Sequence, residues 1–129
     1  MYGNRRFSAA AQRSQERRER ENQAPRLSSE VPLLLNLRLE IGETSNGVPV
    51  AEPKHIKKVV VEHAPALFLL PCGDSRCDNG GHDVTHSIMR SVRAGETQFD
   101  GEDSCHGSTG GAPCGRTLHY SAQAEYKPA

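Results

Sequence analysis

The 129-residue sequence predicts an α+β fold in which a small antiparallel sheet carries one packed helix. Three patterns lead to this prediction. Apolar residues alternate with other residues over 33–41 and again over 117–126, which is the period of a strand with one buried face. Residues 83–94 carry an apolar stripe at helical spacing. We therefore expect about five strands, with the helix covering one face of the sheet.

The first half of the domain is predicted to form three strands. In the strand over 33–41, one face would carry Leu33, Leu35, Leu37, Leu39 and Ile41. Residues 44–47 (TSNG) supply a turn, because Asn and Gly accept the backbone angles that turns require. Residues 56–62 (IKKVVVE) and 66–70 are rich in β-branched and apolar side chains and predict the second and third strands.

The second half is predicted to contain the helix and two more strands. Asp83 can cap the helix, and Gly95 can end it in a left-handed conformation. The apolar stripe of this helix consists of Val84, Ile88, Met89 and Val92. A weaker strand is expected over 97–104. In the strand over 117–126, one face would carry Leu118, Tyr120, Ala122, Ala124 and Tyr126.

The composition predicts a thin hydrophobic core. Leu, Ile, Val and Phe supply only 24 of the 129 residues, and Trp is absent. Small domains with so little apolar material often depend on a disulfide or a metal for stability. The longest nearly apolar run, residues 64–72, is far shorter than the ~20 residues that cross a bilayer, so we expect no contact with a membrane.

The formal net charge of zero is an average over two unlike segments. Residues 1–26 form an N-terminal arm with seven arginines against three glutamates, a net charge of +4, and residues 27–129 form a single domain with a net charge of −4. The arm over residues 8–23 is rich in helix formers but has no apolar stripe, so we expect a solvated helix or a disordered segment. Its arginines are Arg5, Arg6, Arg13, Arg17, Arg18, Arg20 and Arg26.

The arm is the candidate partner-binding segment. Clustered arginines favour a polyanion, of which RNA or DNA is the most natural, and an acidic protein surface is the alternative. The acidic body is a poor nucleic-acid surface by itself. We therefore expect the arm to anchor the chain in a larger complex.

The four cysteines are the strongest chemical signal. Their spacing is Cys72-x4-Cys77 and Cys105-x8-Cys114, and each pair lies beside a predicted strand end or a glycine-rich loop. The N-terminus shows no apolar segment of a secretory signal, so we expect a cytoplasmic, reducing location. Two local cysteine pairs in that setting favour a metal over the alternatives, which are disulfides and unrelated thiols.

This layout resembles the zinc-ribbon group of proteins over about residues 66–126, because two loops of two cysteines each would grip one ion, with a helix between the two halves. The usual ribbon has Cys-x2-Cys in both halves, whereas this chain has x4 and x8 spacings. The resemblance implies a structural Zn²⁺ held by Cys72, Cys77, Cys105 and Cys114. It also implies a role in nucleic-acid or ribonucleoprotein machinery. Four bound thiolates and Zn²⁺ would take the charge of the body to about −6.

Two histidines beside the cysteines are alternative ligands. His82 or His106 could replace one cysteine, although we expect His82 to lie in a loop. A catalytic zinc needs an open coordination position, which four cysteines would close. The sequence also lacks the His-x-Glu of the zinc deaminases.

We therefore expect a non-enzymatic, zinc-stabilised binding or structural module, with no small-molecule substrate evident in the sequence. One alternative is a protein–protein adaptor that uses the sheet and the cysteine loops as its interface. The other is a small metal or thiol enzyme.

Overall fold

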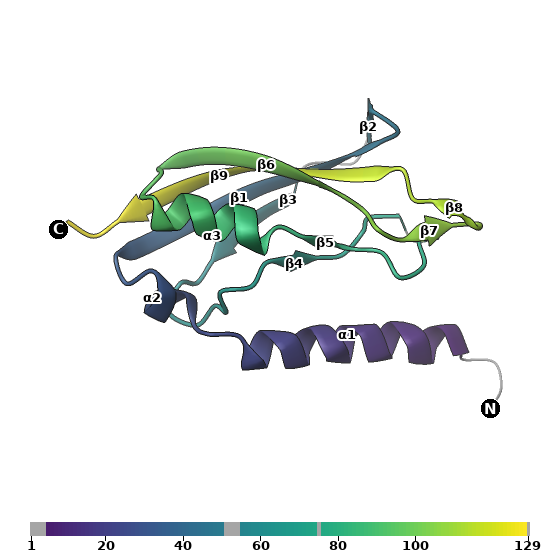
Figure 1. Cartoon of the computed structure of the whole chain (residues 1–129), viewed down its shortest axis with the longest axis horizontal. Helices are drawn as coiled ribbons and strands as arrows, with labels where there is room; N and C mark the ends of the chain where they lie inside the picture. Colours follow the sequence, from purple (N-terminus) through teal and green to yellow (C-terminus); the bar gives the residue numbers. More distant parts are fainter. Residues whose placement is uncertain (1–4, 51–54, 75, 129) are drawn as a thin grey trace.

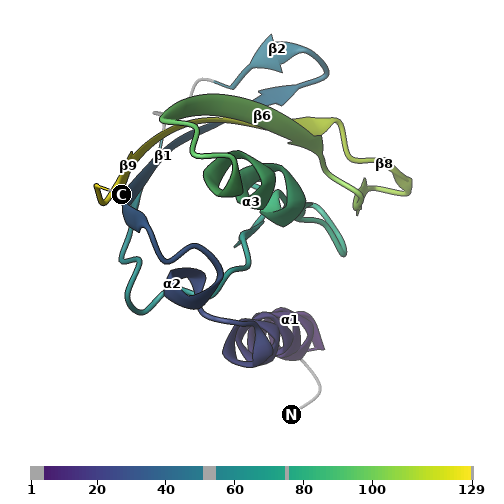
Figure 2. The ribbon, with the colours of Figure 1, turned by 60° about the vertical axis from the view of Figure 1, so that its left-hand side comes forward.

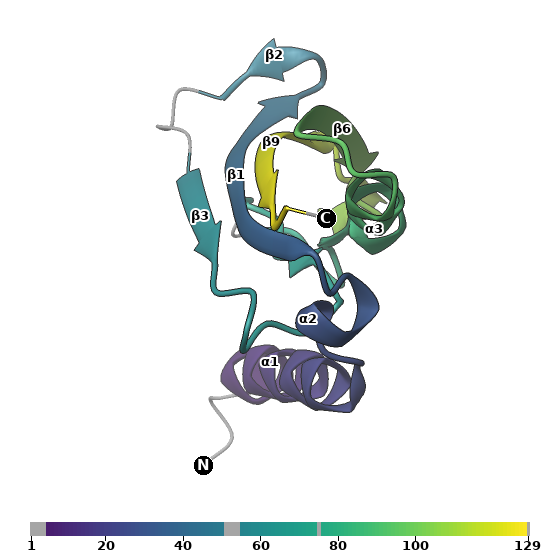
Figure 3. The same ribbon diagram turned by 90° about the vertical axis from the view of Figure 1, so that its left-hand side faces the viewer.

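The computed structural model describes residues 5–50, 55–74 and 76–128 (Figure 1). It confirms the α+β class: an antiparallel sheet curves around helix α3 (Thr85–Arg93), and a longer helix, α1 (Arg5–Gln23), lies outside the sheet (Figures 2 and 3). None of the helices in the described part of the chain combines the length and apolar character needed to cross a bilayer.

The sheet has five strands, all antiparallel to their neighbours. The two longest strands pair at its centre, one flanks them on one side, and two short ones share the opposite edge. In spatial order these are β6 (Gln98–Ser104), β9 (Arg116–Tyr126), β1 (Leu34–Ser45), and then β3 (His55–Val59) and β2 (Val48–Pro49), which pair with different parts of β1.

The core lies between the inner face of this sheet and α3. The apolar stripe of α3 is buried as predicted, with Ile88 and Val92 almost completely removed from solvent. From β9, four members of the predicted inward set, Leu118, Tyr120, Ala122 and Ala124, are buried opposite it, and the fifth, Tyr126, is half-buried. Each large apolar side chain buried in this way contributes roughly 1.5–3 kcal/mol. The helix ends at Arg93, and Gly95, two residues later, has the expected positive φ of 75°.

The β1 prediction was right about the strand and wrong about which residues face inward at its start. Leu34 is 2% exposed, whereas Leu33 and Leu35 are 50% and 47% exposed. The pairing with β9 shifts between Leu34 and Asn36, which places a bulge at Leu35. A bulge adds one residue to one strand, so the inward phase changes and Leu37, Leu39 and Ile41 follow the predicted alternation only after it.

The strand predicted over 66–70 does not join the main sheet. Only β4 (Leu69–Leu70) is a strand, and it pairs with β5 (His82–Asp83) in a separate two-stranded ladder. Two hydrogen bonds of the Phe68 backbone account for the position of this segment. The Phe68 N–H donates to Thr85 Oγ1, and the Phe68 carbonyl accepts from Val84 N–H. These two bonds attach the segment to the start of α3. The strand predicted over 56–62 likewise ends early, at Val59, and a turn follows over residues 61–63.

The arm is helical as α1, and every described side chain from residue 11 to 23 is at least partly exposed. A short helix that the sequence did not predict, α2 (Leu27–Glu30), follows it and buries Leu27 completely. The backbone from Pro25 to Leu27 bonds to residues 64–66, through Ala66 N–H to Pro25 O and Leu27 N–H to Ala64 O. The chain is therefore attached to the body from Pro25 onward.

Candidate metal centre

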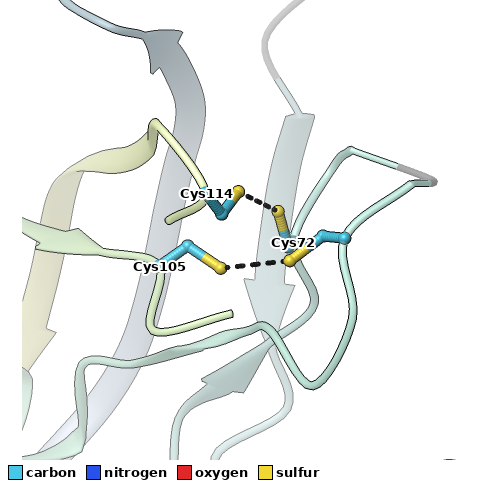
Figure 4. Close-up of side chains that lie close together, drawn as sticks. Cys72, Cys105 and Cys114 are labelled. Atoms are coloured by element: carbon cyan, nitrogen blue, oxygen red, sulfur yellow. Dashed lines mark hydrogen bonds between the residues drawn. The ribbon is translucent and has the colours of Figure 1, made fainter. Parts of the chain in front are cut away.

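Two loops bring the four cysteines to one end of the sheet (Figure 4). Cys72 and Cys77 lie in the loop that leaves β4. Cys105 directly follows β6, and Cys114 lies two residues before β9 begins. Between the last two, the chain makes a small hairpin of β7 (Ser108–Thr109) and β8 (Ala112–Pro113). Because β6 and β9 are neighbours in the sheet, the cysteines at their adjoining ends lie close together.

The sulfur atoms have the spacing of a tetrahedral metal site. Cys72 Sγ lies 3.8 Å from Cys114 Sγ, and Cys77 Sγ lies 3.6 Å from Cys105 Sγ. All four sulfurs lie within 4.8 Å of one another. A disulfide would need about 2.05 Å, whereas four sulfurs at about 2.3 Å from one zinc ion would lie about 3.8 Å apart. The four cysteines could therefore hold a metal ion.

Backbone hydrogen bonds connect the two cysteine loops. Asp78 N–H donates to Ser108 O at 2.7 Å, and Ser108 N–H donates back to Asp78 O at 3.0 Å. Within the second loop, Cys105 N–H donates to Arg116 O and Cys114 N–H donates to Gly107 O, both at 2.9 Å. These bonds fix the separation of the loops, so the sulfur positions do not depend on contacts between the thiols alone.

Two glycines make room for the sulfurs. A Cβ atom on Gly80 would collide with Cys77 Sγ and Cys105 Sγ. A Cβ atom on Gly107 would collide with Cys77 Sγ and with the backbone of residues 78 and 80. Both positions therefore require glycine, because a side chain at either one would overlap with these neighbouring atoms. The sequence alone indicates only turns at these two glycines.

The surroundings of the sulfurs suit thiolates that bind a metal. Cys105 Sγ accepts hydrogen bonds from Gly81 N–H and Gly107 N–H, each at 3.4 Å, and Cys72 Sγ accepts one from Asp74 N–H at 3.5 Å.

Burial opposes the loss of the thiol protons when no metal is bound. It raises the pKa of the Cys72 thiol, and it raises the pKa of the Cys77 thiol to about 12. A bound cation would have to displace these protons.

The pKa of Cys114 is shifted in the other direction. Burial alone raises it, but the backbone hydrogen bond at Arg116 and hydrogen bonds from the neighbouring thiols together lower the pKa below its usual value. Cys114 is thus the thiol that loses its proton most readily among those whose pKa is shifted.

A buried histidine beside the metal site is the feature that the sequence analysis missed. His82 is 3% exposed and lies in β5 rather than in the predicted loop. Its Nε2 lies 3.1 Å from Glu43 Oε2, and its Nδ1 lies 3.3 Å from Asp103 Oδ2. Glu43 also accepts from Arg116 at 3.0 Å and from Gly73 N–H at 3.1 Å. This network joins β1, β5, β6 and β9 beneath the cysteine loops.

The two histidines considered as alternative ligands therefore differ in position. His106 is exposed and belongs to no group of closely spaced ligand atoms among the described residues. His82, Glu43 and Cys72 form a second such group, with ligand atoms within 4.8 Å of one another. Because Cys72 belongs to both groups, His82 adjoins the four-cysteine set without replacing any of its members.

The seven arginines predicted to bind a partner do not form one cluster. Arg13, Arg17 and Arg20 line a hollow between α1 and the body, and Arg18 is exposed on the same helix. Arg26 donates to His63 O at 3.0 Å and so helps to attach α2 to the body. Arg5 and Arg6 lie in the first turn of α1.

No protein-family model, curated protein or solved structure matches this chain. The function must therefore be inferred from the residues and their geometry.

Proposed function

We propose that this protein is a zinc-stabilised, non-enzymatic module that binds nucleic acid through its N-terminal arm. The observation that carries the zinc proposal is the set of four sulfurs at 3.6–3.8 Å within the two facing pairs, on loops joined by their own backbone hydrogen bonds. Zinc is the metal that most commonly takes four cysteine thiolates in a tetrahedron.

A structural role for the metal follows from its ligand number. Four cysteines fill the coordination shell of zinc and leave no position for water or substrate. The site also joins the loops after β4, after β6 and before β9, which are otherwise connected by short ladders. Such a metal stabilises the fold rather than supplying chemistry.

The arm supports the nucleic-acid part of the proposal. Helix α1 has no buried side chain among its described residues, so burial in the core does not account for its sequence. It concentrates positive charge beside an acidic body, and phosphate contacts by arginine are the main source of affinity for nucleic acids. An RNA or DNA partner would place the chain in a larger complex.

The zinc proposal is tested by elemental analysis of freshly purified, reduced protein. We expect one equivalent of zinc in the native chain and much less in the Cys72→Ser and Cys114→Ser variants. Less than about half an equivalent in the native chain would contradict the proposal, since structural sites of this type bind zinc tightly.

The nucleic-acid proposal is tested by deleting residues 1–23. This boundary keeps the hydrogen bonds that begin at Pro25, so the body should remain folded. We expect the full chain to bind RNA or DNA with an affinity that falls steeply with salt, and the shortened chain to lose that binding. Equal binding by both chains would contradict the proposal, with circular dichroism and zinc content as controls for folding.

A second candidate function, a protein–protein adaptor, is favoured by the exposed edge strand β3. Ile56 in β3 is 47% exposed, and Val60 just after it is 61% exposed. An edge strand with exposed β-branched residues can pair with a strand of another protein. Retention of a protein partner by the chain lacking residues 1–23 would support this candidate.

A further inference from the structure

We propose that the hollow between α1 and the body is a binding site for single-stranded nucleic acid. This inference rests on the proposed function and specifies the surface and the type of strand. The hollow has a volume of about 430 Å³ and is lined by one face of α1 and by the segments around β4 and β5. Figure 1 shows α1 alongside these two strands. Ligand sites commonly occupy roughly 300–1,000 Å³.

One wall of the hollow is a row of arginines. Arg13, Arg17 and Arg20 follow one another at helical spacings of four and three residues, so they share one face of α1. Arg17 is 3.7 Å from Glu21, and Arg20 is 4.0 Å from Asp83. Ion pairs this long and this exposed contribute little, so phosphates can take over these guanidinium groups. No carboxylate of the described residues pairs with Arg13.

The opposite wall is apolar and comes from the body. Leu69, Leu70 and Pro71 line it, and His106 from the second cysteine loop adds an exposed imidazole ring. Two carboxylates, Glu16 and Asp83, also border the hollow. An apolar wall facing a row of arginines suits a ligand that has both phosphates and flat, weakly polar surfaces.

Single strands have this combination of groups, whereas duplexes do not offer it at their surface. An unpaired base exposes its ring faces, which can stack on imidazole, guanidinium and apolar side chains while the phosphates contact arginine. In a duplex the bases are stacked inside, and the accessible surface is mostly phosphate and sugar. The mixed lining of the hollow therefore favours a single strand.

The position of the hollow connects it to the metal site. It is also lined by Asn79, Gly80 and Gly81, which lie between Cys77 and His82, and Gly80 packs against two of the cysteine sulfurs. A metal that fixes the cysteine loops would also fix this part of the binding surface. The arm supplies charge, and the metal-supported loops supply the surface against which the strand lies.

The test measures binding of a labelled 12-nucleotide oligo(U) and a 12-base-pair duplex to the full chain by fluorescence anisotropy. We expect tighter binding of the single strand. Arg13→Gln/Arg17→Gln should weaken binding and lower the salt dependence of log K by about 1.4, because each single-strand phosphate contact contributes about 0.7. Arg18→Gln is the matched control for Arg13→Gln alone, because Arg18 is exposed on the same helix and is not among the described residues that line the hollow, and we expect it to have a smaller effect.

A variant in the wall opposite α1 distinguishes binding in the hollow from binding to the arm alone. His106→Glu leaves α1 unchanged and places a negative charge at the hollow, so oligo(U) binding should weaken while zinc content stays the same. Equal losses in Arg13→Gln and Arg18→Gln, no effect of His106→Glu, or equally tight duplex binding would each overturn the inference and leave the proposed function intact. No nucleic-acid binding by the zinc-loaded full chain, or binding only to polyglutamate, would overturn both.

Discussion

Helix α1 and the cysteine loops are both exposed at the surface, but they are held in place very differently. The cysteine loops are joined by reciprocal backbone hydrogen bonds and packed so closely that Gly80 and Gly107 cannot accept a methyl group. Among the described residues, the one ion pair between α1 and the body joins Arg20 and Asp83, at 4.0 Å.

This difference indicates separate roles for the two regions. Close packing and fixed backbone geometry are what a preorganised metal site requires. A weakly held basic helix can adjust its position around a ligand without disturbing the core. The following variants test this contrast, from the largest expected effect to the smallest.

Loss of the metal proposed for the four cysteines should have the largest effect on stability. Cys105→Ser removes one ligand, and a structural zinc can contribute about 10 kcal/mol or more to folding. We expect the variant, like the native protein treated with a chelator, to lose its cooperative thermal unfolding transition. Circular dichroism measures this. An unchanged transition after verified removal of the metal would show that the cysteine loops do not depend on it.

Filling the space at Gly80 should also disrupt the metal site. We expect Gly80→Ala to lower zinc content strongly, because the added methyl group would overlap two sulfurs. Gly110→Ala is the matched control: Gly110 has a φ of 59° and open space around it, so only backbone strain of about 1–2 kcal/mol is expected. Equal zinc content in the two variants would contradict the close packing described here.

Removing the buried histidine should have an intermediate effect. In His82→Ala, Glu43 and Asp103 lose their shared partner, and we expect a loss of about 1–3 kcal/mol in the free energy of unfolding. His106→Ala removes an exposed ring beside Cys105 and should change stability by less than about 0.5 kcal/mol. Urea denaturation measures the free energy of unfolding of both variants. Equal values would show that the His82 network does not stabilise the fold.

The smallest effect is expected at the contact between α1 and the body. Arg20→Ala removes an exposed ion pair whose atoms are 4.0 Å apart, so the free energy of unfolding should change by about 0–1 kcal/mol. The same urea measurement applies. A loss well above 1 kcal/mol would show that α1 belongs to the stable body, contrary to the comparison above.

The sequence predicted the elements whose pattern depends on a single buried face. The alternation in β9 and the apolar stripe of α3 appear as expected, because each packs against one core. The closeness of Cys105 and Cys114 was also predictable, since they lie at the adjoining ends of two strands that pair, β6 and β9. The spacing of Arg13, Arg17 and Arg20 could have indicated a basic helix face, but not the surface opposite it.

Other features depend on contacts between distant residues, which local patterns do not contain. The bulge at Leu35 arises in the pairing of β1 with β9, and it reverses which leucines face inward. The burial of His82 depends on Glu43, 39 residues earlier, and on Asp103, 21 residues later. One signal was present: after the bulge, Glu43 continues the inward alternation of Leu39 and Ile41, so an acidic side chain at that position needs a buried partner.

The central pairing of β1 with β9 also determines when the protein can fold during its synthesis. Its partners are separated by 71 residues at one end, Ser45 with Arg116, and by 92 at the other, Leu34 with Tyr126. Until β9 has left the ribosome, β1 can pair only with β2 and β3, and Cys114 cannot complete the cysteine set. Contacts of such long range slow folding. Before β9 is available, the nascent chain therefore carries three cysteines of the set and an open sheet edge, a combination that makes a partly folded chain prone to aggregation.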